Sequence, residues 1–401
     1  MSDTIGVPVG IPTERDRIFE LPVELESLRD RKPIGRMIYE DGHLGWLVTS
    51  YSLARAVLAD SRFSSRADLA RIPVELPAEA EQARKDIPPG VFHRMDPPEH
   101  TRYRRLLAGH FAVRRMDSLT ETIQRIVDER LHAMDRGGPP ADLVRDFAKL
   151  VPLNVVSEVL GVPEDERDRF VRRVSVLFDQ HAEAADVGAA TQAIHTQFQE
   201  FVDAKKRAGT SGDVLGHLAA SGELPDEEIA TVGMVLLTAG YESTANMLAL
   251  GTLALLEHPD QRARALSNSA QLDKAVDELL RYLSVTHIGP IRTALRDVEL
   301  GGETIKAGDS VSIALPAANR DPEHVECPAA LDIDNSSAGH LAFGYGVHQC
   351  LGQHLARNIL RTSYAGIFRE FPALRLAVPA DELEICTEMP VYGVSRLPVE
   401  W

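Results

Sequence analysis

One stretch of the chain, residues 225–258, limits the possible folds more than any other. It reads "PDEEIATVGMVLLTAGYESTANMLALGTLALLEH" and contains no proline after Pro225. At 1.5 Å per residue it predicts one helix about 50 Å long. Because small and apolar side chains surround it along much of its length, we expect this helix to be buried.

Helical periodicity recurs elsewhere. Apolar residues at i, i+3 and i+4 predict further helices within residues 51–63, 119–134, 143–161 and 272–283. Strand signals are fewer: a hairpin with an Asp-Gly turn in 37–50, short antiparallel strands in 293–315 and a second hairpin in 383–401. The sequence contains no repeat and no low-complexity linker. It therefore predicts a mostly α fold with small antiparallel β-sheets, in which residues 1–401 form a single domain.

Charge and cysteine usage argue against several classes of protein. The chain has 60 acidic and 43 basic residues, a net charge of −17, which argues against nucleic acid as a partner. Its three cysteines, Cys327, Cys350 and Cys386, do not form a disulfide framework, so a reducing compartment is expected. The N-terminus lacks a signal-peptide pattern, and the longest apolar run is shorter than the ~20 residues of a membrane span. We expect a cytoplasmic protein without membrane segments.

The segment "HLAFGYGVHQCLGQHLAR", residues 340–357, surrounds one of these cysteines with glycines. Gly344, Gly346 and Gly352 permit a close backbone approach to a bulky ligand. Cys350 precedes a predicted helix, whose N–H groups favour a thiolate. No further ligands for zinc appear at suitable spacing, whereas haem needs only one protein ligand on that face. The alternative is a buried structural cysteine in a glycine-rich turn.

This segment closely resembles the haem-binding loop of the cytochrome P-450 family, F-G-x-G-x-H-x-C-x-G-x-x-L-A, and matches every fixed position. The resemblance implies haem b as cofactor, Cys350 as the iron ligand and a helix-rich, triangular fold. The residues of the loop that it assigns to the cofactor are Phe343, Gly344, His348, Cys350 and Gly352. Chain length and the missing anchor fit the soluble bacterial members of actinomycete secondary metabolism.

A second motif lies within the long predicted helix. "AGYEST", Ala239 to Thr244, resembles the oxygen-activation motif of the family. Ala239 and Gly240 remove bulk where the cofactor or oxygen is expected. The resemblance assigns Glu242, Ser243 and Thr244 to catalysis, as groups that deliver protons. The family usually carries Thr where this chain has Ser243. A polar notch at a packing interface is the alternative.

Further residues are assigned to the haem carboxylates. Asp96-Pro97-Pro98-Glu99 has the form of a capping box and predicts a helix from Pro97. On that helix His100 and Arg104 are i, i+4 neighbours that can bind a pair of carboxylates. Without the resemblance, a solvated basic face is the better interpretation. The resemblance makes the haem propionates their target and adds Arg292 and His340.

Glu278 and Arg281 form the E-x-x-R motif of the family, and their spacing places them on one helix face. We interpret the pair as structural. Many bacterial members add an arginine from the following segment, where this chain has Asn335. Asparagine retains hydrogen bonding but not the charge.

The resemblance predicts a haem-thiolate monooxygenase that inserts one oxygen atom from O2, by hydroxylation or epoxidation, into a mid-sized apolar small molecule, a secondary metabolite. Oxidative ring coupling without oxygen insertion is the alternative reaction, and a non-catalytic haem sensor or carrier is the alternative class. Soluble bacterial members receive electrons from NAD(P)H through ferredoxin and ferredoxin reductase. No nucleotide-binding fingerprint is fused to this chain, which we expect to be a monomer.

Two surfaces follow from these predictions. The first is a basic face for ferredoxin, formed by Arg102, Arg105, Arg357 and Arg361. The second is a mostly apolar substrate pocket, drawn from residues 65–92, 177–191, 284–292 and 389–392. Its candidate lining residues are Leu69, Ile72, Val74, Leu76, Phe178, Ile288 and Val391.

Overall fold

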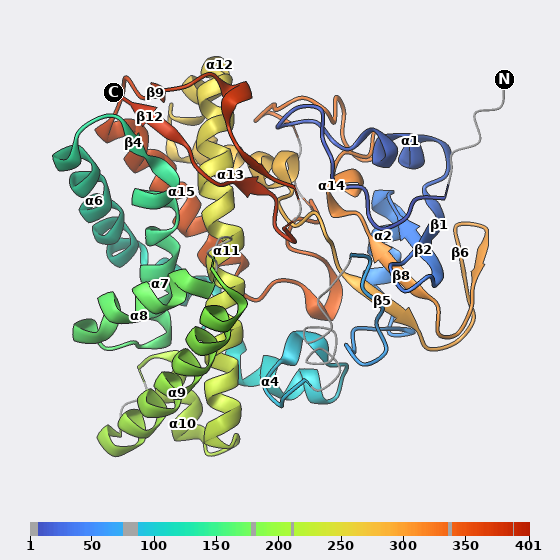
Figure 1. The fold of residues 1–401 in the computed structure, drawn as a ribbon, viewed down its shortest axis with the longest axis horizontal. Helices are drawn as coiled ribbons and strands as arrows, with labels where there is room; N and C mark the ends of the chain where they lie inside the picture. Colours follow the sequence, from blue (N-terminus) through green and yellow to red (C-terminus); the bar gives the residue numbers. More distant parts are fainter. Residues whose placement is uncertain (1–6, 75–86, 178–181, 210–211, 336–338, 388) are drawn as a thin grey trace.

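The computed structural model of the chain describes residues 7–74, 87–177, 182–209, 212–335, 339–387 and 389–401. The long predicted helix is present as α11 (Asp226–Glu257), and its residues from Ile229 to Leu255 are largely buried. In Figure 1, α11 runs through the molecule with most of the other long helices on one side and the largest sheet, together with several shorter helices, on the other. The prediction for this stretch is confirmed.

The other helices of the described residues vary widely in length. They are α1 (Val23–Arg31), α2 (Tyr51–Ala59), α4 (Glu99–Ala108), α5 (Val113–Asp117), α6 (Thr120–Gly137), α7 (Leu150–Leu160), α8 (Glu164–Leu177), α9 (Ala184–Ala208), α10 (Val214–Ser221), α12 (Pro259–Ala265), α13 (Ser269–Leu283), α14 (Leu315–Ala318) and α15 (Gln353–Glu370). Single turns of other helix types are η1 (Phe92–Arg94), η2 (Val144–Ala148), η3 (Gly346–His348) and η4 (Ala380–Glu382). All four predicted amphipathic helices are confirmed, as α2, α6, α7 and α13. Within the described ranges, no helix combines the length and apolar character that crossing a membrane requires.

The strands form four small sheets. The largest has the order β1 (Ile34–Ile38), β2 (Leu44–Val48), β8 (Ser310–Ile313), β5 (Ile291–Ala294), β3 (Phe63–Ser64). The others pair β6 (Val298–Leu300) with β7 (Glu303–Ile305), β12 (Pro398–Glu400) with both β4 (Ala141–Asp142) and β9 (Arg375–Leu376), and β10 (Ile385–Cys386) with β11 (Gly393–Val394). Both predicted hairpins are confirmed. One pairing differs from the expected antiparallel pattern, because β2 and β8 are parallel, with Trp46 opposite Val311.

Glycines on α11 allow neighbouring helices to approach it closely. A Cβ on Gly240 would lie 2.9 Å from a methyl carbon of Val156 on α7. A Cβ on Gly251 would overlap the ring of Tyr364, whose hydroxyl donates to the Met247 carbonyl at 2.6 Å. Since cores are packed without spare volume, these positions require glycine for packing alone.

The predicted capping box at the start of α4 is wrong. α4 begins at Glu99, after Pro98, and no side chain caps it. The carboxylate of Asp96 instead accepts hydrogen bonds from the Ser64 hydroxyl at 2.6 Å and the Ser65 amide at 2.7 Å. A tertiary partner more than 30 residues away in sequence thus outcompetes the local one.

Candidate active site

The cysteine loop precedes α15 and is shaped by two glycines with left-handed backbone. Gly344 has φ +67° and Gly346 has φ +74°. A Cβ on Gly346 would lie 2.5 Å from the Leu58 carbonyl oxygen, so no other residue fits there. The Cys350 amide donates to the Phe343 carbonyl at 2.8 Å and closes the loop. The predicted glycine-rich turn before a helix is therefore present.

The Cys350 thiol is subject to opposing influences. Burial raises its pKa, whereas a hydrogen bond from the Gly352 amide and the charges of Arg104 and Arg357 lower it. At Gly352 a Cβ would meet no protein atom within 4 Å, so the backbone beside the sulfur is open on that side. The balance leaves the pKa of the thiol above its ordinary value, so a bound metal ion would supply the charge that deprotonates it.

Four basic side chains from three segments gather at this loop: His100 and Arg104 of α4, Arg292 of β5 and His348 of η3. We call them the histidine–arginine cluster. The rings of His100 and His348 lie 4.1 Å apart, and the electrostatic effects of Arg104 and Arg292 reach both. The structure thus brings together four residues that the sequence analysis assigned to the cofactor.

Burial and mutual repulsion disfavour protonation of this cluster. Burial, then the charge of Arg104, lower the pKa of His100 to about 4. Burial, then the His100 charge, lower the pKa of His348 to about 3, and burial lowers that of Arg292 to about 10. The Nδ1 atom of His100 is buried, with no hydrogen-bond partner among the described residues. Asp96 supplies one negative charge that acts on His100 and Arg292. Two carboxylates on one ligand would add to it and would give the His100 nitrogen a partner, so these residues fit the propionates of haem.

A further histidine, His93, was missed by the sequence analysis. Its charge is among those that lower the pKa of His348, although the His93 side chain itself is exposed. It precedes the Asp96 motif by three residues and carries no signal of its own in the sequence.

His340, in contrast, contacts residues outside the histidine–arginine cluster. Its Nδ1 accepts a hydrogen bond from the Ala342 amide at 3.2 Å, and its Nε2 lies 3.6 Å from Asp277 on α13. Its assigned propionate role stays a prediction.

The predicted catalytic residues lie in the middle of α11. Burial raises the pKa of Glu242, opposed by the charge of Lys149. The Ser243 hydroxyl donates to the Ala239 carbonyl at 3.2 Å. The Ala239 side chain is exposed, whereas the Thr244 side chain is buried. Gly240 contacts α7, and this contact explains the glycine without a ligand. The motif therefore combines a carboxyl group of raised pKa with two adjacent hydroxyls.

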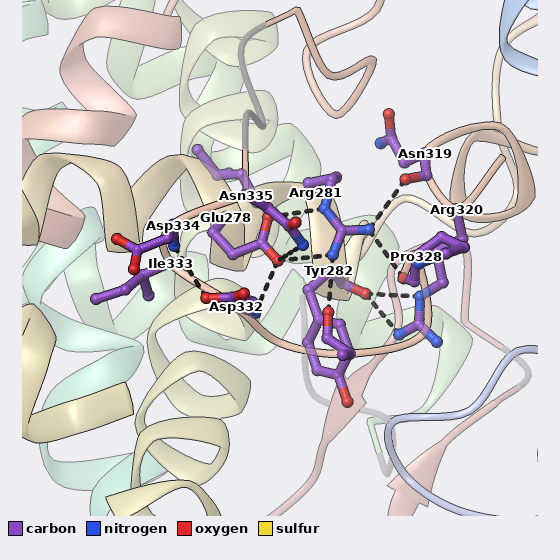
Figure 2. A network of polar contacts seen from close by, with 12 residues as sticks. Glu278, Arg281, Tyr282, Asn319, Arg320, Pro328, Asp332, Ile333, Asp334 and Asn335 are labelled. Atoms are coloured by element: carbon purple, nitrogen blue, oxygen red, sulfur yellow. Dashed lines mark hydrogen bonds and ion pairs between the residues drawn. The ribbon is translucent and has the colours of Figure 1, made fainter. Parts of the chain in front are cut away.

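Glu278 and Arg281 form a buried ion pair, shown in Figure 2. Arg281 donates Nε–H and Nη2–H to the two carboxylate oxygens of Glu278, both at 2.7 Å. Its remaining N–H groups donate to three carbonyl oxygens, those of Asn319, Pro328 and Ala330. All five N–H donors of the guanidinium are therefore used.

Asn335 contributes to the same network, with an amide that donates to Glu278 Oε1 at 3.4 Å (Figure 2). The Asp332 amide donates to the same oxygen at 3.1 Å. The predicted hydrogen bond from Asn335 is present. This hydrogen bond is long, and the Asp332 backbone amide donates a shorter one to the same oxygen.

The predicted basic face is a surface of mixed charge. Arg102 and Arg105 of α4 pair with Glu228 and Glu223, and on α15 Arg357 and Arg361 pair with Asp277 and Asp273. Because each arginine has an acidic partner from this chain, they do not form the free basic patch that we expected.

Comparisons with known proteins agree with this geometry. The model of the family described as "Cytochrome P450" matches residues 175–384. Cytochrome P450 105C1 from Streptomyces sp. is 43% identical over 398 residues, which cover 99% of this chain and 100% of the relative. This chain belongs to the cytochrome P450 family. It is therefore a haem b monooxygenase that takes electrons from NAD(P)H through partner proteins.

Two further P450s support the assignment. A vitamin D3 dihydroxylase from Streptomyces griseolus is 37% identical over 413 residues, covering all of both chains. The crystal structure of the P450 GfsF superposes with a TM-score of 0.93 at 37% identity, covering 99% of this chain and 100% of the other. The mostly α fold with small separate sheets is thus confirmed as the P450 fold.

Proposed function

We propose that Cys350 is the haem-iron ligand of this P450, and that the enzyme inserts one oxygen atom from O2 into a mid-sized apolar small molecule. The observation that carries the proposal is the geometry of the Cys350 loop: Gly344 and Gly346 have left-handed backbone, and the Cys350 amide donates to the Phe343 carbonyl just before α15.

Burial raises the pKa of the Cys350 thiol, and the Gly352 amide, Arg104 and Arg357 oppose that rise. The nearby histidine–arginine cluster supports the proposal, because its two arginines and the unpartnered Nδ1 of His100 suit a ligand with two carboxylates.

In this proposal the cofactor supplies the oxidising chemistry, and a thiolate ligand favours O–O cleavage. The chain's own residues divide the remaining tasks. His100, Arg104, Arg292 and His348 hold the carboxylates. The backbone at Gly352 leaves room beside the sulfur.

Glu242 is proposed to deliver protons, with Ser243 and Thr244 as hydroxyl neighbours. Its raised pKa keeps a proton on the carboxyl closer to neutral pH than an exposed glutamate would, as a general acid requires. We expect E242Q to reduce product formed per NAD(P)H consumed about 100-fold, at the lower limit of what general acid–base catalysis contributes. A product yield equal to that of the unaltered enzyme would exclude Glu242 from this role.

The substrate class rests on two kinds of support. A relative at 37% identity is named a vitamin D3 dihydroxylase, which fits hydroxylation of an apolar molecule. Several predicted lining residues are apolar, although Leu76 and Phe178 lie outside the described residues. Ile72, Val74, Ile288 and Val391 are partly buried in the structure.

Two experiments test the proposal. Purified protein, reduced under carbon monoxide, should show the strongly red-shifted Soret band of a thiolate ligand, and C350A should lose it. Turnover under labelled dioxygen should then place one labelled atom in the product. Turnover without labelled product would indicate ring coupling, and absence of turnover with any electron donor would indicate a sensor or carrier.

Ferredoxin and its reductase remain the proposed electron donors, with the enzyme acting as a monomer. Because the arginines on the candidate docking face are paired with acids, we expect only modest slowing of reduction by ferredoxin between low and physiological salt. A steep fall in the rate with added salt would instead indicate a strongly basic docking surface.

A further inference from the structure

Asn319 lies at the end of α14 and is completely buried. Its side-chain oxygen Oδ1 accepts a hydrogen bond from the Leu341 amide at 2.6 Å, and its Nδ2 donates to the Ser284 hydroxyl at 2.7 Å. Its own carbonyl accepts from Arg281 Nη1 at 3.1 Å (Figure 2). These partners lie 22 to 38 residues away in sequence, so one residue joins α14, the end of α13 and the start of the cysteine loop.

The bond to Leu341 holds the beginning of the cysteine loop. The Leu341 carbonyl accepts the Gly344 amide at 2.8 Å, and Gly344 has left-handed backbone. One residue earlier, the Phe343 carbonyl accepts the Cys350 amide at 2.8 Å. Asn319 is thus bonded to the first peptide of a loop that the cysteine closes, and this bond fixes where the loop starts relative to α14.

The bond to Ser284 holds an unfavourable backbone conformation at the end of α13. Ser284 has φ +39°, in the left-handed region that residues other than glycine rarely adopt. Its hydroxyl donates to the Arg281 carbonyl at 2.8 Å and accepts from Asn319 Nδ2 at 2.7 Å. The chain continues into residues 285–288, which pair with the C-terminal turn, residues 390–392. Both segments belong to the regions predicted to line the substrate pocket.

An amide side chain suits this position better than any apolar one. A backbone N–H can only donate, so the atom that faces Leu341 is the amide oxygen, and the NH2 group then faces Ser284. Asn319 thereby supplies one acceptor and one donor at a site without solvent. A leucine of similar size would leave the Leu341 amide and the Ser284 hydroxyl without this partner, and the loss of a buried partner is costly.

We propose that Asn319 is a positioning residue of the P450 reaction: it holds the cysteine loop in a fixed place against the end of α13, so that the Cys350 sulfur is presented in one position. The inference rests on the proposed role of Cys350 as iron ligand. Asn319 acts through Leu341 and Ser284, and it is itself neither a ligand nor a proton donor.

Asn358 provides a matched control. It is a second buried asparagine, on α15, and its Nδ2 donates to the Met116 carbonyl and to Thr120 Oγ1, both at 3.0 Å. These partners belong to α5 and α6 and lie outside the cysteine loop. Replacement of Asn358 by leucine therefore removes buried hydrogen bonds of the same kind without changing a bond to the loop.

Two variants separate the two side-chain bonds of Asn319. N319L removes both of them. S284G removes only the bond to Ser284, because glycine adopts left-handed backbone readily and Leu341 keeps its acceptor. If the bond to Leu341 positions the loop, S284G should have the smaller effect. A role confined to the end of α13 would instead make the two variants equal.

The experiment compares purified holoprotein of the unaltered form, N319L, S284G and N358L. Each is reduced under carbon monoxide, and the rate at which the red-shifted Soret band converts to the unshifted band is followed at one pH and temperature. We expect conversion about tenfold faster in N319L, the size expected for loss of roughly one to two hydrogen bonds, and about threefold faster in S284G. N358L should convert at the unaltered rate, although urea unfolding should show it destabilised to a similar extent as N319L.

Other outcomes overturn the inference. An unaltered rate in N319L would show that the loop needs no support from Asn319. Equal acceleration in N358L would reduce the effect to global stability, and equal acceleration in S284G would assign it to α13 rather than to the loop. If N319L yields no holoprotein, S284G decides: a rate above that of N358L supports positioning, and a rate equal to it counts against positioning. If the unaltered protein shows no red-shifted band, the proposed role of Cys350 fails instead.

Discussion

Two buried charged groups in this molecule are built in opposite ways. In the Glu278–Arg281 network, every N–H of the guanidinium has an acceptor, and the charges cancel. In the histidine–arginine cluster, burial and the neighbouring arginine charges lower the pKa values of both histidines, and His100 keeps a buried nitrogen with no partner among the described residues.

The contrast indicates what each group is for. A buried charge is tolerable when it is paired and hydrogen-bonded, so the completed network stabilises the fold and leaves no donor for a ligand. An incomplete cluster costs stability in the protein alone, and a ligand of opposite charge recovers that cost. The same comparison yields predictions that differ in sign as well as size.

The largest expected effect is on the completed network. Glu278→Gln leaves Arg281 buried without a counter-charge, so we expect a loss of about 3–5 kcal/mol in the free energy of unfolding. Urea unfolding of the holoprotein measures it. The control is D273N, which breaks a partly exposed pair and should cost less than about 1 kcal/mol. If the two variants lose the same stability, the Glu278–Arg281 network is not what distinguishes the buried pair.

A smaller effect, with a different readout, is expected in the cluster. Arg292→Gln removes one donor to the haem carboxylates, so haem should leave the protein about 10–100-fold faster, as expected for loss of a charged hydrogen bond of about 1.5–3 kcal/mol. Transfer of haem to apomyoglobin measures this rate.

The stability of the haem-depleted R292Q protein provides the comparison with the Glu278–Arg281 network. This protein should be no less stable than unaltered haem-depleted protein, because the variant removes a buried cation whose desolvation lowers its pKa to about 10. A loss of stability as large as that of E278Q would show that Arg292 belongs to a completed network.

Smaller still is a pH effect carried by His100. Its pKa of about 4 in the folded protein lies below the ordinary value near 6.5, so the unfolded chain binds the proton more readily. Its contribution is complete above about pH 6.5 and is lost as pH falls toward 4, by roughly 1–3 kcal/mol. Urea unfolding of haem-depleted protein across this range measures the slope. H100Q should flatten the slope, and an unchanged slope would assign it to other groups.

The smallest effect concerns Asn335. Its hydrogen bond to Glu278 is 3.4 Å long, and the Asp332 amide donates to the same oxygen. Asn335→Ala should therefore cost about 0.5 kcal/mol, at the lower limit for a hydrogen bond. Thermal or urea unfolding tests this, and a cost near that of E278Q would make Asn335 a full member of the network.

Much of the fold could be predicted because its signals are local. The span of α11, the amphipathic α2, α6, α7 and α13, and both hairpins follow from periodicity and turn residues within each segment. The glycine-rich turn at the cysteine could also be predicted, because the left-handed backbone at Gly344 and Gly346 strongly favours glycine.

The failures share one physical cause. The Asp96 cap was wrong because Ser64 and Ser65 compete for its carboxylate. The basic face was overestimated because Arg102, Arg105, Arg357 and Arg361 each find an acid from another segment. The parallel pairing of β2 with β8 joins strands that are more than 250 residues apart in sequence.

By itself the sequence determined the helices, the hairpins and the glycine-rich turn that presents Cys350, because backbone preferences and hydrophobic period act over a few neighbouring residues. Only the tertiary structure decided which charges are neutralised and which are not. It completed Arg281 with carbonyls from three separate residues and tied Arg357 to Asp277. It also brought His100, Arg292 and His348 together in a site where burial and the arginine charges disfavour protonation of the histidines. Charge compensation depends on distance in space, and groups far apart along the chain meet only when it folds.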